Sequence, residues 1–185
     1  KYKDLVLPDI KKLLQSKIHE ERLIAILILV YNFSSFAKAS EDKRKRIFDF
    51  YLKHTKYINN WDLVDLSADK IVGQYLLDKS KDILFRLARS KNLWERRISI
   101  VATYQFIKDG RYQETLKISE MLLKDDHDLI HKAVGWMLRE VGKLCSQEIL
   151  EKFLKEHYQK MPRTMLRYAI ERFPEKLRKE YLNLL

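Results

Sequence analysis

The chain has 185 residues, a length suited to one well-cored domain or one short array of repeats. Gly and Pro occur only 4 and 3 times, which argues against a fold rich in strands and tight turns. Lys and Arg outnumber Asp and Glu by 37 to 26, giving a net charge of +11. This surplus indicates a polyanionic partner if the cations share one face, and a merely solubilising surface if they do not.

The single cysteine, Cys145, excludes an internal disulfide and a thiolate zinc site, and fits a reducing compartment. The longest apolar run, Leu23 to Phe33 interrupted by Asn32, is too short to span a bilayer. No basic-then-apolar pattern typical of a secretion signal is found in the first residues of the sequence. We therefore expect a cytoplasmic protein with no membrane partner.

Apolar residues recur at helical spacing along almost the whole chain. The predicted helices are 4–16, 20–34, 42–55, 61–76, 81–90, 93–109, 112–124, 127–142, 147–158, 162–172 and 174–184. Residues typical of N-caps precede five of them: Asn60, Ser80, Asn92, Asp126 and Ser146. Gly110 and Gly142 stand where helices are expected to stop.

The predicted helices pair, and the pairs repeat. Four segments align, each a short polar turn followed by a helix: SKIHEERLIAI, YINNWDLVDLS, SKNLWERRISI and DDHDLIHKAVG. An apolar residue stands at the matching position of each, at Ile24, Leu66, Ile98 and Val134, with intervals of 42, 32 and 36 residues. This period predicts an all-α, HEAT-like helical repeat solenoid, with a plain helical bundle as the alternative.

In a solenoid the second helix of each pair lines the concave side, so equivalent positions form a column along one groove. Asp65 and Arg97 are equivalent, 32 residues apart. Trp61 lies one turn before Asp65, and Trp136 one turn beyond the equivalent place on a later inner helix, so all four are expected to face the groove. Basic residues are expected to add phosphate contacts along it: Arg96, Lys132, Arg139, Arg163 and Arg167.

Structural roles stand beside these functional ones. Tryptophans on helices usually belong to the core, and Asp65 paired with Arg97 is also a plausible structural ion pair. The carboxylates of Asp62 and Asp65 around Trp61 favour a wet face, because a buried carboxylate needs a partner. Trp94 is expected to be a structural anchor at its helix start.

Other chemistry has less support in the sequence. His127 and His131 lie four residues apart, which is half of a metal site, but no third ligand follows at a suitable spacing. A structural role is therefore expected for both. The sequence has no Gly-rich phosphate loop and no G-x-S-x-G motif, so no cofactor and no metal are expected.

Three segments carry a family resemblance: INNWDLVDLSA (58–68), NLWERRISIV (92–101) and DLIHKAVGWMLREVGK (128–143). Together they resemble signature stretches of the AlkD-like DNA alkylation repair family, HEAT-like-repeat DNA glycosylases that remove N3- and N7-alkylated purines. The resemblance runs from about residue 4 to 182. It implies a monomer that acts on double-stranded DNA containing alkylated purines, at the nucleoid of a bacterial cell and without a cofactor.

By motif, the resemblance makes Asp65 the catalytic carboxylate and Arg97 the groove arginine that holds a DNA phosphate. Trp61 and Trp136 match the aromatic residues that flank the sugar of the lesion. Residues 1–185 are expected to form one repeat domain, and family members carry further helices before the point matching Lys1. The alternatives are a non-catalytic repeat protein that binds damaged or branched DNA, and a protein-binding scaffold.

Overall fold

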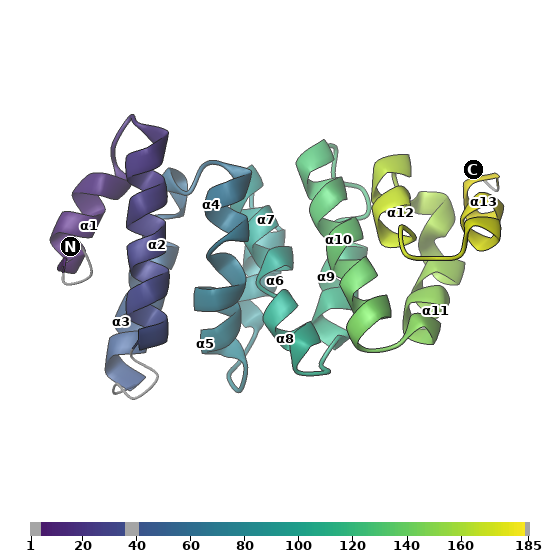
Figure 1. The fold of residues 1–185 in the computed structure, drawn as a ribbon, viewed down its shortest axis with the longest axis horizontal. Helices are drawn as coiled ribbons and strands as arrows, with labels where there is room; N and C mark the ends of the chain where they lie inside the picture. Colours follow the sequence, from purple (N-terminus) through teal and green to yellow (C-terminus); the bar gives the residue numbers. More distant parts are fainter. Residues whose placement is uncertain (1–4, 36–40, 184–185) are drawn as a thin grey trace.

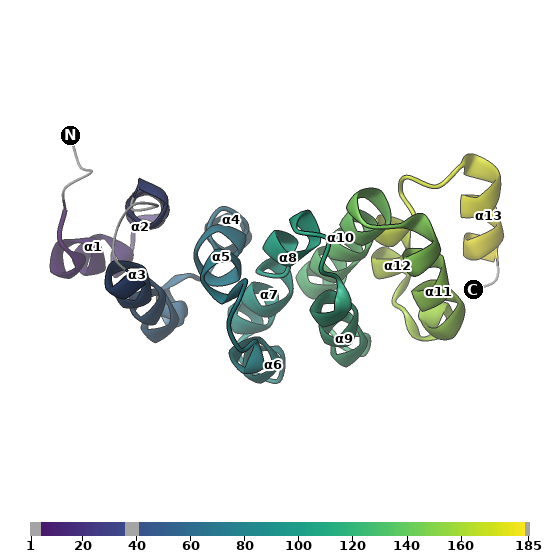
Figure 2. The same cartoon turned by 90° about the horizontal axis from the view of Figure 1, so that it is seen from below.

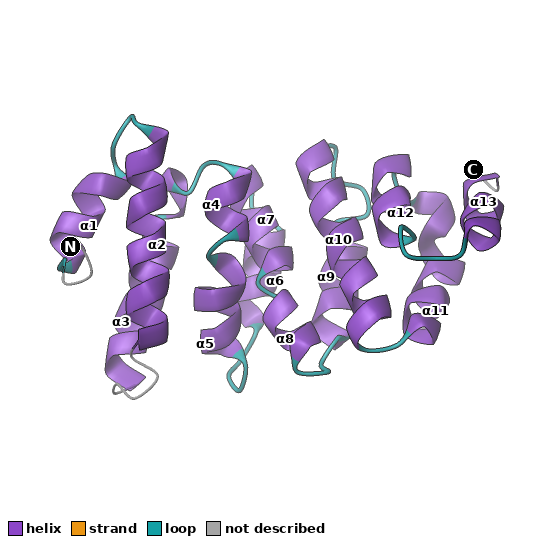
Figure 3. Ribbon diagram, viewed as in Figure 1, coloured by secondary structure: helices purple, strands orange, loops and turns teal. Residues whose placement is uncertain are grey.

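The computed structural model describes residues 5–35 and 41–183. The expected first residue of helix 4–16 and last residue of helix 174–184 lie outside these ranges. The described residues form helices and loops, with no strand among them (Figure 3). The α-helices are α1 (Leu7–Leu14), α2 (His19–Ser35), α3 (Glu41–Lys53), α4 (Trp61–Asp65), α5 (Gln74–Leu76), α6 (Asp82–Ala88), α7 (Leu93–Val101), α8 (Tyr104–Lys108), α9 (Gln113–Met121), α10 (Asp128–Leu144), α11 (Gln147–His157), α12 (Arg163–Ala169) and α13 (Glu175–Asn183). Short 3-10 turns occupy Thr55–Tyr57 and Tyr158–Lys160, and a π-helical stretch occupies Ala68–Gly73.

The helices stand in a row, with the two chain ends at opposite ends of the molecule (Figure 1). Seen from below, they form two layers (Figure 2). We call α2, α4–α5, α7–α8, α10 and α12 the inner layer, and α3, α6, α9 and α11 the outer layer. The chain alternates between the layers, so the predicted all-α helical repeat architecture is confirmed.

The same hydrogen-bonded turn opens three of the inner helices. The side chain of Ser16 accepts from the backbone N–H of Ile18, and that of Ser90 accepts from Asn92, each at 3.0 Å. The third turn repeats the pattern with the Asp125 carboxylate and the N–H of His127, also at 3.0 Å. The shared hydrogen-bonding pattern of these turns therefore identifies equivalent positions in the repeats independently of the spacing of apolar residues.

A side chain on each of these helices bonds back to the same turn. Arg22 donates to the carbonyl of Ser16 at 2.9 Å, and Arg96 donates to that of Ser90 at 3.0 Å. His131 takes the same place through a hydrogen bond from Nε2 to the carbonyl of Asp125. Each bond spans six residues, so the three side chains are structural equivalents that close the turn before the helix.

The capping residues set the register of the repeat. Asn60, Asn92 and His127 cap α4, α7 and α10 through their side chains. The interval from Asn92 to His127 is 35 residues, so Ala133, and not Val134, is the equivalent of Ile98. Asp126 is not the cap of α10, because the turn places the His127 ring on the N–H of Leu129.

Two predicted helices are interrupted where they meet. The helix expected over 61–76 is broken by the π-helical stretch Ala68–Gly73, and the helix expected over 93–109 is broken between α7 and α8. A Cβ on Gly73 would collide with the carbonyl oxygen of Ala102, so the two backbones approach as only glycine allows. The breaks therefore come from packing between helices, which the apolar period does not register.

Buried apolar side chains run along the whole row, from Ile10 to Tyr181, between the two layers. The apolar column predicted from the alignment is only half buried: Ile98 and Val134 are in the core, whereas Ile24 and Leu66 are 43% and 38% exposed. Within the described ranges, no helix is long and apolar enough to cross a membrane.

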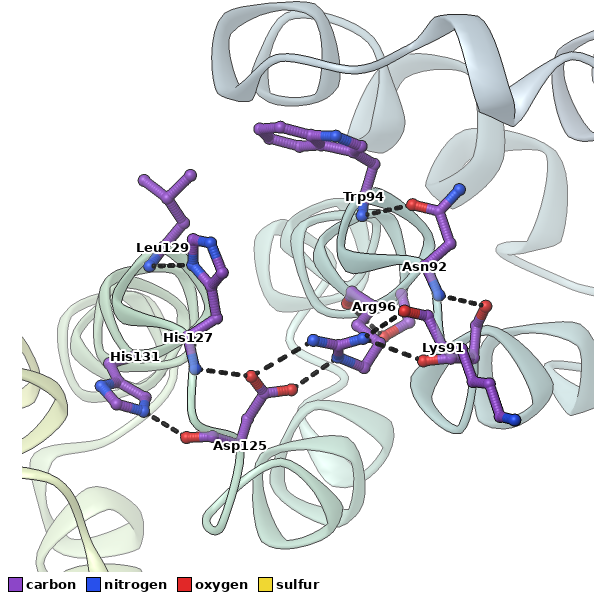
Figure 4. Close-up of polar contacts among 10 residues, drawn as sticks. Lys91, Asn92, Trp94, Arg96, Asp125, His127, Leu129 and His131 are labelled. Carbon is purple, nitrogen blue, oxygen red and sulfur yellow. Dashed lines mark hydrogen bonds and ion pairs between the residues drawn. The ribbon is translucent and has the colours of Figure 1, made fainter.

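A carboxylate–guanidinium pair ties two neighbouring repeats together (Figure 4). Arg96 Nε lies 2.6 Å from Asp125 Oδ2, and the same guanidinium donates to the carbonyls of Ser90 and Lys91. The Asp125 side chain is only 7% exposed. The pair therefore fixes α10 and its turn against the start of α7.

Replacing Arg96 by Met is expected to lower the free energy of unfolding by about 1–3 kcal/mol, because it removes the charged partner of a buried carboxylate and a donor to two turn carbonyls. Urea unfolding measures the difference. The matched control is Lys12→Met, which removes an exposed pair with Asp9 and is expected to change stability by less than about 1 kcal/mol. Equal effects of the two substitutions would contradict a structural role for Arg96.

Candidate nucleic-acid interface and active site

An ion pair between two inner helices forms the centre of the candidate site. Asp65 is the last residue of α4, and Arg97 lies in α7; each follows its capping asparagine by five residues. Arg97 Nε and Nη2 donate to the two carboxylate oxygens of Asp65 at 2.9 and 2.7 Å. This forked geometry fixes the orientation of the carboxylate more firmly than a single contact would.

A third helix joins the pair. Arg97 Nη1 donates to the carbonyl of Leu129, in the first turn of α10. Arg97 is 5% exposed, whereas the side chain of Asp65 remains 17% exposed. The guanidinium is thus buried between three helices, and the carboxylate is the member of the pair that reaches the surface.

The surface above Asp65 is hollow. A depression of about 360 Å³ is lined by Trp61, Asp65, Arg97, Leu129, Lys132, Trp136, Arg139 and Tyr168. The structure thus brings together the four residues that the sequence predicts to face one groove: Trp61, Asp65, Arg97 and Trp136. Trp61 is 53% exposed, so it belongs to the wall of this hollow and not to the core.

The second tryptophan, Trp136, packs against the ring of Tyr104. The centroids of the Trp136 and Tyr104 rings lie 6.0 Å apart. The Nζ atom of Lys108 lies 4.8 Å from the centroid of the Tyr104 ring. Lys108 also contacts Asp69 at 3.2 Å. Burial raises the pKa of the Tyr104 hydroxyl, and the charges of Glu140 and Asp69 raise it further. Tyr104 therefore stays neutral behind Trp136.

The polar group below the site is also neutral. The Tyr51 hydroxyl is buried and lies 2.8 Å from the hydroxyl of Ser67. Burial raises the pKa of Tyr51, and the negative charges of Asp69 and Asp65 act in the same direction. Tyr51 therefore stays neutral, and the charged partner of the Asp65 carboxylate is Arg97.

The predicted basic residues separate into three groups. Lys132 and Arg139 line the hollow above Asp65, and together with Arg167 they also line a second one next to it. Arg163 is exposed but lines neither hollow. The structure does not bring Arg96 into the groove at all, because its guanidinium is turned toward Asp125 and the turn before α7.

The column predicted for the groove continues through the molecule. The fifth residue after each cap is Asp65, Arg97, Lys132 and Arg167, when Pro162 is taken as the cap of α12. The intervals are 32, 35 and 35 residues. The column therefore begins with a carboxylate and continues with cations, which suits an anionic strand laid along it.

Several residues that line the two hollows were not identified from the sequence, and Tyr168 and Arg178 are two of them. Tyr168 lines both hollows and is 37% exposed, and Arg178 from α13 lines the second. Tyr168 follows Pro162 by six residues, as Ile98 follows Asn92, so extending the repeat alignment to α12 would have located it. Nothing in the sequence marks Arg178, because α13 lies outside the repeat.

The two histidines with half-site spacing have structural partners. His127 caps α10 by accepting from the N–H of Leu129 at 3.1 Å, and His131 closes the turn at Asp125 (Figure 4). Asp62, beside Trp61, pairs with His19 at 2.7 Å. In the part of the chain that the structure describes, no group of three His, Cys, Asp or Glu side chains is arranged to hold a metal ion.

Comparison with known proteins bears on this site. A family model described as "DNA alkylation repair enzyme" matches residues 2–173. Among solved structures, the chain is similar to a "Predicted DNA alkylation repair enzyme from Enterococcus faecalis", with a TM-score of 0.69 and 18% identity over 91% of this chain and 76% of that one. At that identity the likeness shows a shared fold. Curated proteins give no match. Because the family model covers nearly the whole sequence, the chain belongs to the family of DNA alkylation repair enzymes.

Proposed function

We propose that the protein is a monofunctional DNA glycosylase that hydrolyses the N-glycosidic bond of purines alkylated at N3 or N7. One observation carries the proposal: the Asp65 carboxylate is held by the Arg97 fork and lines an open hollow that Trp61 and Trp136 also line. Family membership supports the coarser role, the repair of alkylated DNA.

A single carboxylate suits this reaction. A purine alkylated at N3 or N7 is already cationic, so it departs without a general acid. As the bond to C1′ breaks, positive charge develops on the deoxyribose, and a fixed aspartate stabilises that charge and orients the attacking water. Because Arg97 holds Asp65 in place before substrate binds, little reorganisation is needed during the reaction.

The tryptophans suit a cationic substrate for a related reason. The face of an indole ring attracts cations, by about 0.5–2 kcal/mol depending on desolvation. Trp61, which is exposed, and Trp136, which packs against Tyr104, both line the hollow above Asp65. We propose that the two rings flank the sugar and the alkylated base of the damaged nucleotide.

We propose that Arg97 acts mainly by positioning the carboxylate of Asp65. Its burial and its two bonds to Asp65 support a role in positioning the carboxylate. Direct contact between Arg97 and a DNA phosphate stays a prediction. Lys132 and Arg167, which are nearer the surface in the same column, are better placed to meet the backbone.

A second function, non-catalytic binding of damaged or branched DNA, is favoured by the same ion pair. A free carboxylate in a phosphate-binding groove would repel DNA, but Arg97 balances the charge of Asp65. The two functions differ in one measurement, the release of 7-methylguanine from a methylated duplex by the wild-type protein. Release supports the glycosylase; binding without release supports the non-catalytic protein. A scaffold for proteins would show no steep fall of DNA affinity with salt.

Single alanine substitutions at Lys132 and Arg167 are each expected to weaken binding to duplex DNA and to reduce the slope of log affinity against log salt by about 0.9, the value for one lost phosphate contact. The matched control is Lys117→Ala, which removes one exposed cation from α9 in the outer layer. Fluorescence anisotropy at several salt concentrations measures all three. A change at Lys117 as large as at the groove residues would place the DNA elsewhere.

A further inference from the structure

A second hollow adjoins the one above Asp65. It has a volume of about 560 Å³, lies between α10, α12 and α13, and shares Lys132, Arg139 and Tyr168 with the first. Four cations and two carboxylates line it, which leaves an excess of two positive charges. The cations are Lys132, Arg139, Arg167 and Arg178, and the carboxylates are Asp128 and Glu171.

Arg139 is fixed from below. Its Nε and Nη2 atoms lie 3.2 and 3.1 Å from Oε1 of Glu140, the next residue of α10. Glu140 is only 4% exposed, whereas the side chain of Arg139 is 20% exposed. The buried carboxylate therefore sets the direction of the guanidinium, and the third nitrogen, Nη1, points to the hollow.

Glu171 is the group that meets Nη1. It lies in the turn between α12 and α13, its side chain is 56% exposed, and it pairs with Arg139 through that nitrogen alone. An ion pair with so much solvent around one member contributes little to stability. Since Glu140 already holds Arg139, Glu171 is not needed to orient it.

Lys132 pairs with Asp128 at 2.6 Å, but two other cations of the hollow lack acceptors for some or all of their donors. Among the described residues, the side chain of Arg167 makes no ion pair or hydrogen bond, and Nε of Arg178 is buried without an acceptor. Tyr168 adds a hydroxyl on the side shared with the Asp65 hollow. Forked guanidinium groups together with hydroxyls are the donors that bind phosphate oxygens in proteins.

We infer that this second hollow binds a backbone phosphate of the strand that crosses Asp65, and that Glu171 occupies the place of that phosphate on Arg139 in the free protein. The inference rests on the proposed function only in taking DNA as the ligand. Glu171 is then a built-in competitor: it lowers affinity for undamaged DNA, where phosphate contacts supply nearly all of the binding.

The test is the affinity of Glu171→Gln for an undamaged duplex, measured over a range of salt concentrations. The variant is expected to bind about 3–10 times more tightly than the wild type and to show a salt slope steeper by up to about 0.9, because one phosphate contact no longer competes with a carboxylate. Undamaged DNA keeps the result independent of base release, so a failed glycosylase proposal would leave this measurement unaffected.

The matched control is Glu175→Gln, which removes the same charge four residues along the chain, from an exposed pair with Lys179 that lines no part of the hollow. It is expected to bind like the wild type. In the background of Arg139→Gln, the Glu171→Gln substitution is expected to have no further effect. Equal tightening by both glutamate variants, weaker binding by Glu171→Gln, or an effect that survives Arg139→Gln would overturn the inference.

Discussion

Replacing Asp65 by Asn is expected to slow the release of 7-methylguanine from a methylated duplex by about a hundredfold or more, and to leave DNA binding intact or slightly tighter. The substitution keeps the size of the side chain and removes the charge that stabilises the developing oxocarbenium-like sugar, an interaction whose loss typically lowers kcat by about 10²–10³. Binding is retained because a negative charge has been removed from a groove that holds phosphates. Single-turnover base release and duplex affinity, measured on the same preparation, test both parts.

The same substitution also disturbs the fold, so stability must be measured beside activity. Asn offers one acceptor where Arg97 donates to two, and breaking a buried ion pair lowers the free energy of unfolding by about 3–5 kcal/mol. The double variant Asp65→Asn, Arg97→Gln replaces the charged pair by a neutral hydrogen-bonded one. It is expected to regain part of the stability and none of the base release.

A matched control lies on the same short helix. Asp62→Asn makes the same chemical change three residues away, on a carboxylate that pairs with His19 and does not line the hollow. Its rate of base release is expected to stay within a few fold of the wild type. If Asp62→Asn and Asp65→Asn lose activity equally, or if neither does, Asp65 is not the catalytic carboxylate.

The contrast between Arg97 and Arg96 shows how far the sequence determines the site. The 32-residue equivalence of Asp65 and Arg97 was visible in the repeat, and the structure joins them by two hydrogen bonds. Arg96 directly precedes Arg97 in the sequence, yet its side chain turns back to close the loop before α7 and to pair with Asp125. Which of two adjacent arginines faces the groove depends on the rotation of the helix about its axis, and the cap at Asn92 fixes that rotation.

The fold was predictable where it follows from apolar period, and less so where it follows from close contact. The existence and order of the helices could be predicted because each buries one face in a continuous core. The breaks near Gly73 and Ala102 could not, because they arise where two helices meet and a Cβ would not fit. Gly142 was expected to end a helix, but α10 continues to Leu144, and the glycine instead leaves room for the side chain of Leu150.

Glycine at position 135 has the most consequence for the site, because it sets the distance between α10 and α12. An added Cβ would lie 2.5 Å from the carbonyl oxygen of Met165 and 2.5 Å from the Cβ of Tyr168. Both are rigid, since one is backbone and the other is the first side-chain atom. Gly135→Ala must therefore push α12 away from α10, and Tyr168 with it.

We expect Gly135→Ala to lower the free energy of unfolding by about 2–4 kcal/mol, through overpacking that exceeds the helix propensity gained by alanine. Because Tyr168 lines both hollows, duplex affinity is expected to fall as well. Gly142→Ala is the control in the same helix: its Cβ would meet mainly the flexible end of the Leu150 side chain, and a change of less than about 1 kcal/mol is expected. Urea unfolding and duplex binding of both variants decide the matter, and equal stability of the two would show that α12 can shift without loss.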